Sequence, residues 1–119
     1  MEGKSVLKEK SFAFGLNIIE VCRQLKDSKT EYILYRQLLR SGTAIGALIR
    51  EAEYAQSKAD FVNKLSIALK EANETEYWLD LLIESQCLEK ETHTDSVQLV
   101  KELIRMLIAS INTLKKVNN

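Results

Sequence analysis

The sequence predicts an all-α protein, an antiparallel up-down-up-down four-helix bundle that forms a single domain over residues 1–119. The chain contains no proline and only four glycines, the residues that make the frequent reversals of β and α/β folds. Apolar residues recur at alternating spacings of three and four in four successive segments. The polar breaks between these segments are short, which favours antiparallel packing of successive helices.

We expect the first helix near residues 5–26 and the second near 31–55. The apolar stripe of the first helix comprises Phe14, Ile18, Val21 and Leu25, and Leu7 can extend it. The stripe of the second comprises Tyr35, Leu38, Gly42, Ile45, Ile49 and Ala52. Ser28 and Glu31 have the spacing of a capping box at the start of the second helix. Gly42 and Gly46 lie within this helix, where the missing side chains would let a neighbouring helix backbone approach closely.

We expect the third helix near residues 58–86 and the fourth near 95–116. Ser57 and Asp60 form a variant capping box, with aspartate in place of glutamate. The third stripe comprises Phe61, Leu65, Ala68, Ala72, Thr75, Leu79 and Leu82. Thr94 or Asp95 can cap the fourth helix after the polar run 89–93. The fourth stripe comprises Val97, Val100, Ile104, Leu107, Ile111 and Leu114.

No pattern in the sequence predicts an active site, a metal centre or a cofactor site, so we expect a protein that is not an enzyme. The only histidine, His93, falls in the polar connection before the fourth helix, where we expect it to be solvated. The acidic residues of 71–80 lack the Glu-x-x-His pairs of a di-iron bundle. Cys22 and Cys87 lie in apolar patterns, which predicts buried thiols in a reducing cytoplasm rather than a disulfide.

Neither a membrane segment nor a signal peptide is predicted. The longest uncharged stretches, such as 41–49 and 106–114, hold nine residues each, whereas a membrane-spanning helix needs about 20. The first ten residues carry charges where a signal peptide would need its apolar centre. We therefore expect a cytoplasmic protein with no membrane contact and no small-molecule substrate.

Opposite charges on the second and third helices predict their register. If these helices fold back about Ser57, Arg40 faces Glu74 and Glu51 faces Lys64. Partly buried pairs of this kind fix the register of two helices and add little net stability. A polar ligand site around Arg40 and Glu74 is the functional alternative.

The third and fourth helices carry more apolar surface than one bundle can bury. The additional side chains are Ile67, Trp78 and Leu81 on the third helix and Leu99, Leu103 and Met106 on the fourth. A helix that is apolar on two sides faces either a central core or a partner, so we predict a homo-oligomer. We expect its interface to include Leu99, Leu103, Met106 and Trp78. The acidic third helix against basic first and fourth helices favours a head-to-tail contact, which closes into a ring.

Lysines gather at one end of the predicted bundle, where the start of the first helix, the turn after the second helix and the C-terminus meet. They are Lys4, Lys8, Lys10, Lys58, Lys115 and Lys116. In a ring, these lysines would repeat around a rim and attract the phosphates of RNA or DNA. No aromatic residues are interleaved for base stacking, so such binding would be weakly sequence-specific. A solvated, solubilising end is the alternative.

Several blocks of the sequence resemble a known family. They are Lys10-Ser-Phe-Ala13, 37–46 (QLLRSGTAIG), Glu51-Ala52, Ser57-Lys-Ala-Asp-Phe61, 64–72 (KLSIALKEA) and 74–79 (ETEYWL). These blocks resemble the four-helix-bundle proteins encoded in 23S rRNA intervening sequences, also labelled the S23 ribosomal protein family. The chain is similar, too, to the accessory variability proteins of diversity-generating retroelements, which are pentameric barrels that bind nucleic acid and a reverse transcriptase. The resemblance implies a bacterial, cytoplasmic pentamer with no established enzymatic activity.

Two functional hypotheses follow. The first is a non-catalytic homo-oligomeric bundle of this family that acts through protein or RNA contacts. The alternative is a nucleic-acid-binding accessory subunit of a reverse-transcriptase-like partner. The lysine-rich end favours the alternative, whereas the balance of 17 Lys+Arg against 17 Asp+Glu disfavours it.

Overall fold

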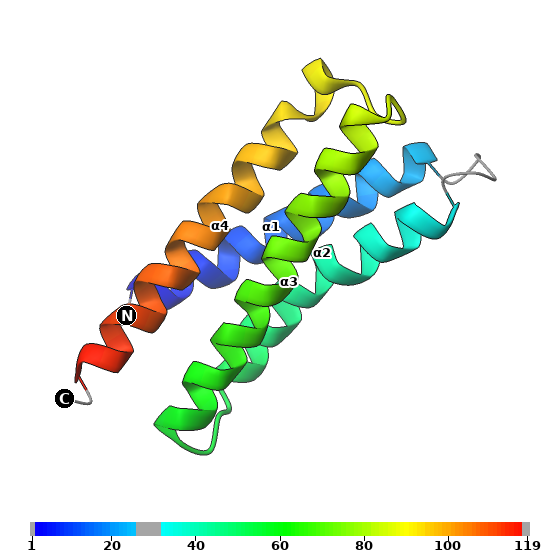
Figure 1. The fold of residues 1–119 in the computed structure, drawn as a ribbon. Helices are drawn as coiled ribbons and strands as arrows, with labels where there is room; N and C mark the ends of the chain where they lie inside the picture. Colours follow the sequence, from blue (N-terminus) through cyan, green and yellow to red (C-terminus); the bar gives the residue numbers. More distant parts are fainter. Residues whose placement is uncertain (1, 26–31, 118–119) are drawn as a thin grey trace.

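The computed structural model describes residues 2–25 and 32–117, and within these ranges the chain forms four helices and no strands (Figure 1). The helices are α1 (Glu2–Leu25), α2 (Tyr32–Ala52), α3 (Lys58–Glu84) and α4 (Lys90–Val117). They form an elongated bundle with extents of 49 × 23 × 20 Å. The predicted all-α four-helix bundle is therefore confirmed. The α1–α4 contact is the smallest of the four contacts between neighbouring helices.

The core consists of the stripes predicted for α1, α2 and α3, together with a shifted stripe on α4. Its largest fully buried apolar side chains are Phe14, Ile18, Leu38, Ile45, Leu79, Leu82, Val100, Leu103 and Leu107. On α4, Val97, Ile104 and Leu114 are only half-buried, whereas Leu103 exposes 1% of its surface. The prediction that Leu103 lies at an oligomer interface is therefore wrong, because this side chain fills the space between Val100 and Leu107 inside the bundle.

The helix boundaries follow local capping chemistry. At the start of α3, the Ser57 hydroxyl accepts a hydrogen bond from the Asp60 amide at 3.0 Å, and the Asp60 carboxylate accepts one from the Gln56 amide at 3.1 Å. The cap predicted at Ser57 is therefore present. Just after the end of α3, Gln86 adopts the left-handed backbone conformation (φ 67°) that is common where helices end. The capping box predicted at Ser28 and Glu31 lies outside the described residues.

Helix α4 begins five residues earlier than predicted, at Lys90 instead of residue 95. The polar run that precedes residue 94 is thus the first turn of the helix, and the predicted cap at Thr94 or Asp95 is wrong. The Thr94 hydroxyl donates instead to the Lys90 carbonyl, one turn back, at 2.7 Å. His93 exposes only 5% of its surface and extends the buried stripe of α4 towards its start, so the prediction of a solvated histidine is also wrong.

Two glycines of α2 let α1 approach closely, as the sequence predicted. A Cβ atom added at Gly42 would lie 2.9 Å from both γ carbons of Ile18, which is fully buried. A Cβ atom at Gly46 would lie 3.4 Å from the carbonyl oxygen of Ser11. The short distance between α1 and α2 therefore depends on the absence of side chains at these positions.

Ion pairs between α2 and α3 have the predicted register. Arg40 pairs with Glu74, and Lys64 Nζ lies 4.0 Å from Glu51 Oε1. The α2–α3 turn, the start of α1 and the end of α4 lie at the same end of the bundle (Figure 1).

Candidate functional site

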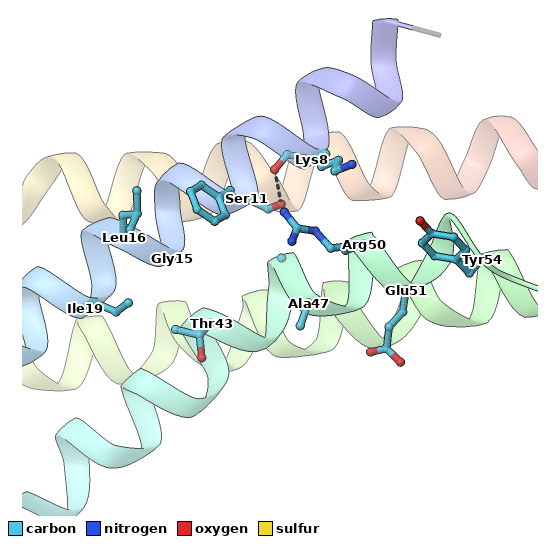
Figure 2. A pocket seen from close by; sticks show the side chains of 12 residues that line it. Lys8, Ser11, Gly15, Leu16, Ile19, Thr43, Ala47, Arg50, Glu51 and Tyr54 are labelled. Atoms are coloured by element: carbon cyan, nitrogen blue, oxygen red, sulfur yellow. Dashed lines mark hydrogen bonds between the residues drawn. The ribbon is translucent and has the colours of Figure 1, made fainter.

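An open apolar groove lies between α1 and α2 (Figure 2), with a volume of about 470 Å³. Its α1 wall consists of Phe12, Leu16 and Ile19, which expose 57%, 56% and 37% of their surfaces. These residues are spaced four and three apart, so they form one stripe along α1. The stripe lies beside the core stripe of α1 and faces solvent.

The floor of the groove is made of small residues, Gly15 on α1 and Gly46 and Ala47 on α2. At Gly15, an added Cβ atom would meet nothing within 4 Å. A glycine inside a helix costs about 1 kcal/mol relative to alanine, and no packing contact within the bundle requires it at this position. The backbone of α1 is therefore accessible to a molecule that enters the groove.

The end of the groove nearest the start of α1 is charged and aromatic. The Arg50 guanidinium carbon lies 5.9 Å from the centre of the Phe12 ring, which is the distance of a cation–π contact. Tyr54 lies at the same end and exposes 81% of its surface (Figure 2). Lys8 forms an ion pair with Glu53 at 3.1 Å. Within the described ranges, no carboxylate forms an ion pair with Arg50.

A second exposed apolar patch lies on the outward face of α3. Tyr77 and Leu81, one helical turn apart, expose 56% and 38% of their surfaces. The Tyr77 ring packs edge-on against the half-buried Trp78, with 5.1 Å between ring centres. Asp80 and Glu84 are exposed on the same helix. Partial desolvation by the neighbouring helix surface and the carboxylates of Glu76 and Glu84 raise the pKa of Asp80, and Lys101 of α4 opposes this shift.

The residues predicted to form the oligomer interface are placed differently by the structure. Leu99 and Met106 are half-buried and pack against the core. Trp78 is also half-buried, and its indole nitrogen donates to Glu74 at 3.1 Å. The exposed apolar side chains include instead a stripe on α1, Phe12, Leu16 and Ile19, which the sequence interpretation missed.

Arg40 lies in a cluster with two carboxylates of α3. Arg40 contacts Glu74 and also Glu71, at 3.3 Å, a partner that the sequence interpretation missed. Glu71 lies one turn before Glu74, on the same face of α3. The Trp78 hydrogen bond and the Arg40 guanidinium hold the pKa of Glu74 below its usual value. Because the Arg40 guanidinium already pairs with Glu71 and Glu74 of the same chain, the cluster serves to hold α2 against α3.

The predicted lysine-rich end is partly neutralised within the chain. Lys8 pairs with Glu53, and Lys10 pairs with Glu102 on α4 at 3.1 Å. The other lysines of this end are Lys58, which is half-buried, and Lys115 and Lys116, which are exposed. Within the described part of the chain, no carboxylate forms an ion pair with these three. The structure does not describe the side chain of Lys4.

The seam between α1 and α4 is polar. His93 Nε2 lies 3.2 Å from Gln24 Oε1, and the Ser96 hydroxyl donates to Asn17 Oδ1 at 2.7 Å. On the side of α1 that faces α2, the Cys22 thiol donates to the Tyr35 carbonyl, and burial raises its pKa to about 11, which keeps it protonated and unreactive at neutral pH.

Among the side chains that the structure describes, no three His, Cys, Asp or Glu residues lie close enough together to hold a metal ion. Over the same ranges, none of the four helices is sufficiently long and apolar to cross a membrane.

Comparisons with known proteins give two findings. A profile of the 23S rRNA-intervening sequence protein family matches residues 4–109. The fold is also similar to that of a solved protein of unknown function from the S23 ribosomal protein family of Bacteroides thetaiotaomicron VPI-5482. The two chains share 47% sequence identity, with a TM-score of 0.88, over 92% of this chain and 98% of that chain. No functionally curated protein matches the sequence.

Proposed function

Since this chain belongs to the 23S rRNA-intervening sequence protein family, we propose that it is a non-catalytic homo-oligomer of the cytoplasm that acts through protein contacts. The observation that carries the proposal is the exposed stripe Phe12, Leu16 and Ile19 along the α1–α2 groove. Contiguous apolar surface of this kind marks interaction sites on soluble proteins. The family resemblance implies five copies, and a closed ring of five is the assembly we expect.

The size of the stripe sets a requirement on the partner surface. Fully burying a leucine-sized side chain contributes about 1.5–3 kcal/mol, and these side chains are already partly covered, so each would add about 1 kcal/mol. A micromolar complex requires about 8 kcal/mol. The groove therefore supports stable association only if the partner surface contributes apolar side chains of its own.

Light scattering on the purified chain tests the proposal. We expect a mass near five times 13.6 kDa for the wild type at micromolar concentration. The substitution Leu16→Glu places a charge in the groove and should shift the mass towards the monomer while helicity by circular dichroism is retained. Ile33→Glu is the matched control, because Ile33 exposes 70% of its surface and lies outside the groove. A wild-type mass of 13.6 kDa would contradict the proposal.

RNA binding is a second candidate, supported by the lysines at one end of the bundle that have no carboxylate partner. Lys115 and Lys116 are exposed at the end of α4, which lies near the start of α3 (Figure 1). A gel shift with structured RNA at increasing salt concentration tests this function, since phosphate contacts weaken steeply with salt. Replacing Lys115 and Lys116 by glutamate should abolish the shift, whereas the same change at Lys70, which is exposed on α3, should preserve it.

A further inference from the structure

We propose that the α1–α2 groove of one copy receives the outward face of α3, around Tyr77 and Leu81, from a second copy. The inference rests on the proposed self-association and identifies the two surfaces that meet. Each surface is apolar and exposed, and the two lie on different helices of the same chain.

The apolar parts of the two surfaces have matching spacing. Tyr77 and Leu81 are four residues apart on α3, as Phe12 and Leu16 are on α1. Four residues of α-helix rise about 6 Å, so the two pairs can pack against each other along nearly parallel or antiparallel axes. The open space above Gly15, where an added Cβ atom would meet nothing within 4 Å, leaves room for a bulky side chain such as Tyr77.

The charges that flank the two surfaces are opposite. Arg50 stands at one end of the groove, and no carboxylate of the described ranges forms an ion pair with it. Asp80 and Glu84 flank the α3 patch, and they also have no ion-pair partner among the described residues. Near Asp80, Glu76 and Glu84 are carboxylates, and Lys101 of α4 is a cation that forms its ion pair with Glu76 at 3.1 Å, so carboxylates are in excess around the α3 patch. A guanidinium supplied by a second copy would relieve this excess.

The charges also favour this pairing over a contact between two grooves. In a symmetric groove-to-groove contact, the carboxylate that lines the groove is Glu51, which already lies 4.0 Å from Lys64 Nζ. Arg50 would therefore gain no unpaired carboxylate there, whereas the α3 face supplies Asp80 and Glu84. A contact between groove and α3 leaves one unused surface of each kind on every dimer. Further copies can therefore add in the same way, and the series ends when the rotation between neighbours closes a ring.

Mixing two defective variants tests the pairing. Leu16→Glu disables the groove and leaves the α3 face intact, whereas Tyr77→Lys disables the α3 face and leaves the groove intact. We expect each variant alone to be monomeric. An equimolar mixture should form a heterodimer of twice the 13.6 kDa chain mass, because one intact groove meets one intact α3 face.

The outcomes separate this inference from the proposed function. A monomeric wild type would contradict self-association itself. If the wild type is oligomeric but the mixed variants stay monomeric, the pairing of surfaces is wrong while self-association stands. The same holds if the Tyr77→Lys variant keeps the wild-type mass. Arg50→Glu provides a second test, in which the apolar side chains of both surfaces are unchanged. It should weaken association about tenfold, and Asp80→Lys in the same chain should restore much of this loss. No restoration by Asp80→Lys would also overturn the pairing.

Discussion

Replacing Gly42 by alanine tests how the α1–α2 contact is built. Alanine is the better helix former, so the substitution would be expected to stabilise an isolated α2 by about 1 kcal/mol. In the bundle, the new Cβ atom would lie 2.9 Å from Ile18 Cγ1 and Cγ2 and 3.2 Å from Ile18 Cβ. Rotation about χ1 of Ile18 moves the two γ carbons but leaves its Cβ in place. Relief of the clash therefore requires α1 to move away from α2.

The net effect should be destabilising. Overpacking of a buried site typically costs about 1–3 kcal/mol, and Ile18 is fully buried with a stiff, β-branched side chain. After the gain in helix propensity is subtracted, Gly42→Ala should lower the free energy of unfolding by up to about 2 kcal/mol. The same substitution at Gly15, where an added Cβ atom meets nothing within 4 Å, should raise it by about 1 kcal/mol.

Urea unfolding followed by circular dichroism measures both changes. The measurements belong in a Leu16→Glu background, so that association does not add to the stability of the folded chain. The comparison between Gly42→Ala and Gly15→Ala is matched, because both replace a glycine inside a helix. If Gly42→Ala is as stable as Gly15→Ala, close approach of α1 is not the reason for the glycine, and our account of the contact is wrong.

Three further predictions concern polar side chains. Thr75→Val should cost about 1–2 kcal/mol in urea unfolding, because it removes a hydroxyl 2.8 Å from that of the fully buried Ser41. In a chain whose only cysteine is Cys22, a thiol reagent at pH 8 should react at the rate of unfolding, since burial raises this pKa to about 11. Glu74, whose pKa is lowered, stabilises the fold above its ordinary pKa and loses this effect as pH falls through its folded-state value. Wild type should therefore lose more stability than Glu74→Gln between pH 7 and pH 3.

The bundle was predictable because three of its helices have regular apolar stripes and matching charges. Helix α4 was predicted less well, since polar residues occupy two positions of its buried stripe. His93 and Ser96 are both buried, and each is hydrogen-bonded to a side chain of α1, Gln24 and Asn17. These partners are distant in sequence, and nothing in the local pattern of α4 indicates them. Because these polar residues belong to the buried stripe, the sequence interpretation placed the stripe of α4 on the wrong residues. It therefore put the start of α4 too late and Leu103 outside the core.

The sequence contains a second apolar stripe on the first helix that indicates the groove, and the interpretation did not use it. Phe12, Leu16 and Ile19 have the four-and-three spacing that also defines the core stripe of α1, so two stripes run along one helix. Periodicity alone does not say which of the two is buried. The structure distinguishes them, because Phe14 and Ile18 are fully buried whereas Phe12 and Leu16 expose more than half of their surfaces.

Assembly and RNA binding are linked if both proposals hold. Among the described side chains of the common end, three lysines have no carboxylate partner, since Lys8 and Lys10 are already paired with Glu53 and Glu102. The affinity of a protein for nucleic acid and its salt dependence grow with the number of phosphates contacted. One copy therefore binds RNA weakly, whereas a ring multiplies the same lysines around one rim. A monomeric Leu16→Glu variant should lose most of the RNA affinity although all of its lysines are intact, which separates a rim formed by assembly from a site that each chain carries alone.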